Sequence, residues 1–230
     1  MRGFFFSENM KLADLISENY NLILMLPRFG IPLGFGDKSV ADICKNHHIP
    51  VDFFLLVCNI YSFEHFIPDK MLISSIDMNF LLPYLLASHR YYKEERIPHI
   101  ENHLQHLIEK SEAKYGKILL QFFNEYKEEV NEHFRHEEEQ VFPHLEALQK
   151  GNSDNSYYIR TFVPEHSNIE DKLSDLTRII CKYFPGNILP NESIELIFDI
   201  LQFSDDLEKH KLIEEKILVP YVAYLERRIQ

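Results

Sequence analysis

The chain has few of the residues that build disulfide frameworks, thiolate metal sites or β-sheets with tight turns. Its three cysteines are far apart in the sequence and form no CxxC pair, so neither disulfides nor a thiolate zinc site are expected. Only 7 glycines occur in 230 residues, and long stretches lack proline, which favours helices over sheet. No apolar run reaches about 18 residues, so no membrane-spanning helix is expected.

Basic residues are outnumbered by acidic ones. Lys and Arg total 24 against 36 Asp and Glu, which gives a formal net charge of -12 with His neutral. A general nucleic-acid-binding role needs a basic surface that displaces counterions from phosphates, so none is expected here. The start, MRGFFFSENMKLADL, has an apolar run too short for a signal peptide and no small-residue cleavage site. We therefore expect a cytoplasmic protein that contacts neither nucleic acid nor membrane.

Histidine, in contrast, is abundant and unevenly placed. The chain has 12 His, and nine of them lie at or after residue 89. At 230 residues and 45% hydrophobic, the chain can bury the core of one large domain or two small ones. Any unusual chemistry is therefore expected in the C-terminal part.

Residues 1–66 are expected to form a small helical domain. Apolar residues from Leu12 to Leu26 have a nearly helical spacing, and the glycines and proline of GIPLGFGDKSV indicate a loop. Ser39 is expected to cap a short helix, and Pro50 to start a strongly buried one. Residues 67–80 are expected to be a linker.

Residues 81–230 have the pattern of long amphipathic helices. Breaks fall near residues 111–116, at KGNSDN (150–155) and at FPGNILPN (184–191), where turn-forming residues gather. Four long helices with short connections predict an up-down antiparallel four-helix bundle. The expected fold class is therefore all-α, a small helical domain followed by this bundle.

Two segments of the bundle repeat each other. HFRHEEEQVFP, which starts at His133, has a counterpart in HKLIEEKILVP, which starts at His210. Both read H-x-x-x-E-E, and both place a proline ten residues after the histidine. A spacing of four residues puts His133 and Glu137 on one helix face, and likewise His210 and Glu214.

Two further histidines keep the period of the repeat. His89 and His166 are 77 residues apart, as are the two motifs, and each precedes its motif by 44. In an antiparallel bundle, residues at equal height lie symmetrically about each turn. The midpoints between successive histidines fall at 111, 149–150 and 188, which coincide with the three breaks. We therefore expect all four histidines and both glutamates in one layer of the bundle.

Such a layer has the ligands of a metal site. Four imidazoles and two carboxylates are too many for a closed tetrahedral zinc site, and two carboxylates can bridge two metals. With nitrogen and oxygen ligands and no thiolate, a di-iron site fits best, and di-manganese is the alternative. The ferritin-like pattern of Glu-x-x-His pairs with two more glutamates differs, because here His precedes Glu and histidine is in excess.

Other charged residues near the motifs have an ordinary interpretation. Glu138 is 100° further round the helix than Glu137, so it is expected to face solvent or support a ligand, as is Glu139. His99, His103 and His106 have spacings that could chelate a metal, but no repeated carboxylate accompanies them, so surface or packing roles are expected. The same roles are expected of His47, His48, His65, His136 and His144.

These residues resemble the hemerythrin-like HHE proteins, and specifically the repair-of-iron-centers family of di-iron proteins. LLASHRYY, HFRHEEEQVFP and HKLIEEKILVP match that family's ligand helices in order and spacing. Oxygen-carrying hemerythrins are similar but shorter, and their H-x-x-x-x-D segment is absent here. The resemblance implies iron ligands at His89, His133, His166 and His210, with bridging carboxylates at Glu137 and Glu214.

The N-terminal part also resembles the small domain that precedes the bundle in this family. RFGIPLGFGDKSVADIC is the matching stretch. Many family members have a Cys-Cys pair in that loop, where this chain has Gly34 and Phe35, and Cys44 nearby is single. No thiol-based role of the loop is therefore carried over.

The resemblance implies a stress-response protein that repairs oxidised or nitrosated iron–sulfur clusters. O2 and nitric oxide are the expected small ligands of the di-iron centre, and iron–sulfur proteins the expected partners. Two alternatives stay open: a sensor of O2 or nitric oxide that signals through the N-terminal domain, and a nitric oxide or peroxide reductase. A monomer or a homodimer is compatible with the sequence, and catalytic residues are not assigned.

Overall fold

The computed structural model describes residues 5–75, 77–109, 113–152, 159, 169–183 and 190–229. Within them the chain is helical and contains no β-strand, only an isolated bridge between Lys11 and Ser39. The predicted all-α class is therefore confirmed. No helix in the described ranges is both long and apolar enough to span a membrane.

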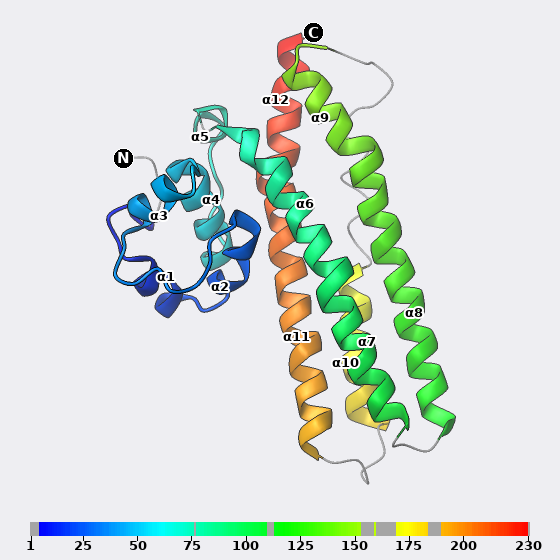
Figure 1. Cartoon of the computed structure of the whole chain (residues 1–230). Helices are drawn as coiled ribbons and strands as arrows, with labels where there is room; N and C mark the ends of the chain where they lie inside the picture. Colours follow the sequence, from blue (N-terminus) through cyan, green and yellow to red (C-terminus); the bar gives the residue numbers. More distant parts are fainter. Residues whose placement is uncertain are drawn as a thin grey trace. The chain divides into compact units, whose positions relative to one another are not determined.

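Short helices form the N-terminal part, and long ones follow (Figure 1). The short ones are α1 (Leu12–Glu18), α2 (Leu22–Met25), α3 (Val40–Asn46), α4 (Val51–Ser62) and α5 (Lys70–Ser75). The long ones are α6 (Leu81–Tyr91) continued by α7 (Ile97–Glu109), α8 (Ala113–His136) continued by α9 (Phe142–Gln149), α10 (Ile169–Tyr183), and α11 (Pro190–Ile213) continued by α12 (Val219–Ile229).

Chain contacts divide the protein into two compact units. The first unit comprises Met1–Ser88, His144–Thr161 and Lys209–Gln230. The second unit comprises His89–Pro143 and Phe162–Glu208. The boundaries expected from the sequence, at residues 66 and 80, stay a prediction.

The second unit is a bundle of α7, α8, α10 and α11. Helix α8 packs against both α7 and α10, and α7 runs in the opposite direction to α8, as α10 does to α11 (Figure 1). All four helices contribute to one apolar core, in which residues recur every three or four positions. Representative core residues are Ile100, Leu104, Phe123, Tyr126, Val130, Leu176, Ile180, Leu196, Ile200 and Phe203.

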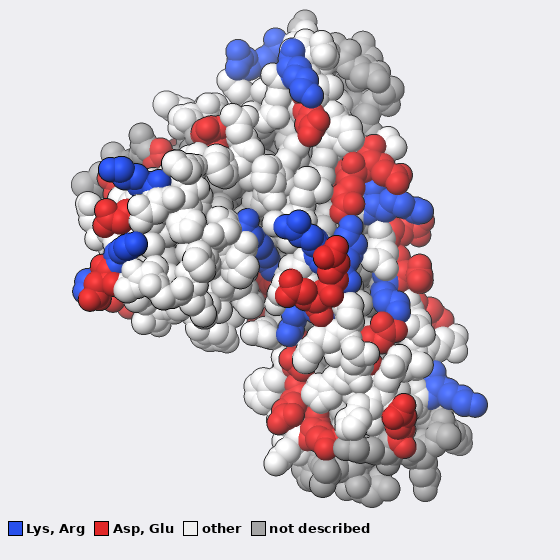
Figure 2. All heavy atoms as spheres, viewed as in Figure 1, with Lys and Arg blue, Asp and Glu red and all other residues white. Residues whose placement is uncertain are grey.

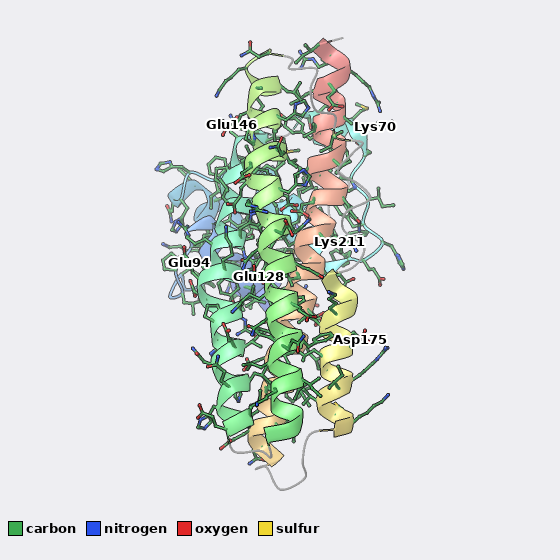
Figure 3. All side chains as sticks on the ribbon, turned by 90° about the vertical axis from the view of Figure 1, so that its right-hand side faces the viewer. Lys70, Glu94, Glu128, Glu146, Asp175 and Lys211 are labelled. Atoms are coloured by element: carbon green, nitrogen blue, oxygen red, sulfur yellow. The ribbon has the colours of Figure 1, made fainter. Side chains whose placement is uncertain are left out.

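Charged side chains line the outside of this bundle. Lys127 on α8 pairs with Glu101 on α7 at 2.7 Å, and Lys172 on α10 pairs with Glu129 on α8. Figure 3 shows side chains filling the space between the helices, with the labelled Glu128 on the exposed side of α8. On the face seen in Figure 2, Lys and Arg lie among Asp and Glu, and uncharged surface separates these groups. The helices are therefore amphipathic as their sequence pattern predicts.

In the first unit, the N-terminal helices begin and end as the sequence predicts, with one difference. Ser39 forms a reciprocal capping box with Asp42, and α4 begins directly after Pro50. The stripe from Leu12 to Leu26 is broken into α1 and α2 at Asn19. The Asn19 amide donates to the Tyr61 carbonyl at 3.2 Å, and its oxygen accepts from the backbone two residues on, which favours a turn over a continuous helix.

The N-terminal helices of the first unit contact the start of α6 and the last helix of the chain. The rings of Phe29 and Tyr84 lie 4.8 Å apart, and the Tyr84 hydroxyl donates to that of Tyr61 at 3.1 Å. Lys216 donates to the Glu64 carbonyl at 2.8 Å, and α5 packs against α12. Tyr84 precedes His89 by five residues, and Lys216 follows Glu214 by two, so both contacts lie close in sequence to expected metal ligands.

Candidate metal centre

His89 occupies the last turn of α6 and is fully buried. Its ring stacks on that of Phe134, with 4.1 Å between centroids and 18° between planes, and on that of Phe142 at 5.5 Å. Its Nε2 atom lies 3.0 Å from Oε2 of Glu137. The two phenyl rings fix the plane of the imidazole, so its nitrogen atoms point in defined directions.

His133 and Glu137 lie one turn apart at the end of α8. Nε2 of His133 is 3.2 Å from Oε1 of Glu137, whose other oxygen faces His89. Glu137 is fully buried, and the His133 side chain is 10% exposed. A buried carboxylate costs several kcal/mol unless it is paired or binds a metal, so two imidazoles directed at one carboxylate fit a cation site.

His210 and Glu214 form the second His–Glu pair, at the end of α11. Nε2 of His210 is 2.8 Å from Oε1 of Glu214, and the two side chains are 3% and 1% exposed. The pair thus reproduces the local geometry of His133 and Glu137, as the sequence repeat predicts. The remaining expected ligand, His166, lies outside the described residues.

A wider, π-helical turn directly follows each of α6, α8 and α11. The sequence pattern did not predict these turns. The π turns cover Tyr92–Arg96, Glu137–Val141 and Glu214–Leu218, so two of them begin at an expected carboxylate ligand. In each turn the residue after it donates its N–H to the carbonyl five residues back: Ile97 to Tyr92, Phe142 to Glu137 and Val219 to Glu214. Such turns are frequent at functional sites because they rotate side chains out of the regular helical register.

Prolines are the sequence signal for these turns. Pro98, Pro143 and Pro220 each stand two residues after a π turn. A proline inside an α-helix clashes with the carbonyl four residues earlier, and a wider turn relieves that clash. The repeated spacing from His to Pro therefore marks a local geometry of the backbone as well as a repeated motif.

Glu138 and Lys93 support His89 from the other side. Nδ1 of His89 is 2.9 Å from Oε1 of Glu138, and Lys93 donates to the same oxygen at 2.7 Å. The hydrogen bond to His89, together with Lys93, lowers the pKa of Glu138 to about 2. Glu138 thus contacts an expected ligand, which fits one of the two roles expected for it. Lys93 was not singled out, although its place one turn after His89 is a usable signal.

The group of buried, potentially metal-ligating side chains comprises His89 and Glu137 in the second unit, and His210 and Glu214 in the first unit. Imidazole nitrogen and carboxylate oxygen suit iron and manganese, and no thiolate belongs to the group. The donor set therefore fits the metal chemistry expected from the sequence. The six-residue ligand set as a whole stays a prediction.

Helical bundle and buried His–Glu group together define a metal-binding protein. The model of the hemerythrin HHE cation-binding domain family matches residues 82–222, which is more than half of the chain. The chain belongs to this family. A comparison with curated proteins finds none that matches it.

Proposed function

We propose that this protein binds two iron ions through six side chains, of which two carboxylates act as bridges. The observation that carries the proposal is the pair of buried His–Glu contacts, at the ends of α8 and α11, inside the segment that matches the cation-binding family. Six nitrogen and oxygen ligands suit two ions, and iron is favoured over manganese. The proposed ligands are His89, His133, Glu137, His166, His210 and Glu214.

The proposed role is repair of iron–sulfur clusters after oxidative or nitrosative stress, as in the repair-of-iron-centers proteins that the sequence resembles. An iron pair, when bound, supplies a centre at which O2 or nitric oxide can bind. The described ligand side chains are nearly all shielded from solvent, which protects such a centre from adventitious ligands. The N-terminal helices precede the matched segment, as they do in that family.

Metal analysis of aerobically purified protein tests the cofactor. We expect about two iron ions per chain and the optical bands of an oxo-bridged ferric pair. Manganese in place of iron, or a single ion without these bands, would contradict the proposal of a di-iron centre.

A repair assay tests the role. An enzyme with a damaged iron–sulfur cluster is incubated with the iron-loaded protein, and its recovered activity is measured over time. The controls are the metal-free protein and free iron at the same concentration. We expect recovery to be faster with the loaded protein than with either control, and equal recovery with free iron would reject the repair role.

A sensor is the second candidate function, because the N-terminal helices contact α6 and the π turn that follows α11, each close in sequence to an expected ligand. In the first unit, Tyr84 packs on Phe29 and Lys216 donates to Glu64. A change at the metal centre could reach the N-terminal helices through these side chains. The test is binding of a partner with and without nitric oxide, in the natural protein and in Lys216→Met. Equal partner binding with and without nitric oxide would count against the sensor function.

A further inference from the structure

A second group of metal-ligating side chains lies in the second unit, between α7 and α11. His99 and His103 are one turn apart on α7, and Asp199 projects from α11. Nε2 of His99 and Nδ1 of His103 both lie 3.1 Å from the same oxygen, Oδ2 of Asp199. Two helices distant in sequence therefore direct three potential ligand atoms at one point.

The three ligand atoms fit a single small cation. All lie within 4.8 Å of one another. Two histidines four residues apart on one helix, completed by a carboxylate, form a common type of three-residue zinc site that leaves a fourth position for water. The side chain of His99 is 55% exposed, while those of His103 and Asp199 are 18% and 23% exposed. The open side at His99 therefore gives an ion access from solvent.

Arg96 determines which Asp199 oxygen is available. Its guanidinium lies 3.6 Å from Oδ1 of Asp199 and donates to the Asp199 backbone carbonyl and to Gln202 Oε1, each at 3.1 Å. Oδ2 is thus left to the two imidazoles. The positive charge of Arg96 opposes a nearby cation, so we expect moderate affinity, unlike that of a closed structural site.

A hydrogen-bonded cluster without metal is the competing explanation. Each imidazole can donate one N–H to Asp199, and such contacts alone would join α7 to α11. A cation site differs in one measurable respect. The protein must then bind an added ion, and its affinity must depend on all three side chains together.

We propose that His99, His103 and Asp199 bind one zinc ion, at a site distinct in its residues from the proposed iron ligands. Imidazole nitrogen and carboxylate oxygen are zinc ligands, and tetrahedral coordination needs one further water. The bound ion joins α7 to α11, and its stabilisation of the second unit rises with the logarithm of the free zinc concentration once that exceeds the Kd.

Zinc titration of the full-length, iron-loaded protein tests this proposal, with a chromogenic chelator as competitor and released iron measured in the same sample. We expect one zinc ion per chain to bind without release of iron. His99→Ala and Asp199→Asn should each weaken this binding at least tenfold. His106→Ala, an exposed histidine on the same helix, should leave it unchanged.

The same titration in the His133→Ala/His210→Ala double variant separates this site from the proposed iron centre. One zinc ion should still bind to the double variant, and a triple variant that also contains His99→Ala should no longer bind it. The proposal is overturned if the number of zinc ions that the natural protein binds does not exceed the number of iron ions that it releases. It is equally overturned if the His99 and Asp199 variants bind zinc as tightly as the His106 variant does.

Discussion

Nδ1 of His89 lies 2.9 Å from Oε1 of Glu138, across 49 residues of sequence. The carboxylate next to an expected bridging ligand therefore orients a histidine on another helix. Support of this kind fixes the tautomer and ring direction of a metal-binding histidine, and its loss typically costs tenfold to a hundredfold in metal affinity.

Glu138→Gln should therefore weaken iron binding about tenfold to a hundredfold. Affinity is measured by competition with a chelator, beside a thermal unfolding curve that reports the fold. Glu139→Gln is the matched control, because Glu139 is exposed. Equal affinity in the two variants would show that Glu138 does not act on His89.

His210→Ala should lower the iron content well below two ions per chain, because it removes one member of a buried His–Glu pair. Iron is measured per chain after loading and desalting. His106→Ala, which alters an exposed histidine, should retain the full iron content. Similar iron loss in both variants would refute the ligand assignment.

Pro143→Ala should stabilise the metal-free protein and weaken its iron binding. The substitution restores a backbone N–H and removes the clash that favours the π turn at Glu137–Val141. An interior proline costs a helix about 3 kcal/mol, which sets the scale of the gain. Thermal unfolding and iron titration are compared with Pro83→Ala, since Pro83 stands in the first turn of α6 and far from any π turn. Unchanged iron affinity in Pro143→Ala would show that the π turn does not contribute to iron binding.

Thiol reagents should modify Cys181 first in the folded protein. Cys181 is exposed, whereas Cys44 and Cys58 are buried. Burial raises the pKa of the Cys44 thiol to about 12, so the reactive thiolate is scarce at neutral pH and grows only as the pH approaches that value. Labelling is followed by mass spectrometry at pH 7 and 9, with Cys181→Ser as control. Rapid labelling of Cys44 in the folded protein would contradict this prediction and would support a thiol-based role of the N-terminal domain.

Much of the fold followed from local pattern. Helix α9 ends at Gln149 beside the turn residues that begin at 150, and α10 ends at Tyr183 while α11 begins at Pro190, because clustered Gly, Asn and Pro disfavour a continuous helix. The expected break at 111–116 is narrower in the structure, since α8 begins at Ala113 and includes Gly116. The contacts of His133 with Glu137 and of His210 with Glu214 were equally predictable, because four residues make one helical turn.

Other features depended on tertiary structure. The turn at Asn19 divides a stripe that reads as one helix, because its side chain bonds to α4. The π turns depend on prolines whose effect on helix width is invisible in an apolar pattern.

The sequence by itself determined an all-α protein of the hemerythrin HHE family and the two His–Glu pairs, since periodicity and the spacing of a repeat are properties of the chain. Only the tertiary structure decided that Glu138 and Lys93 support His89, and that Asp199 meets His99 and His103. These contacts join residues up to about 100 positions apart. Their geometry depends on how helices pack, which no local pattern specifies.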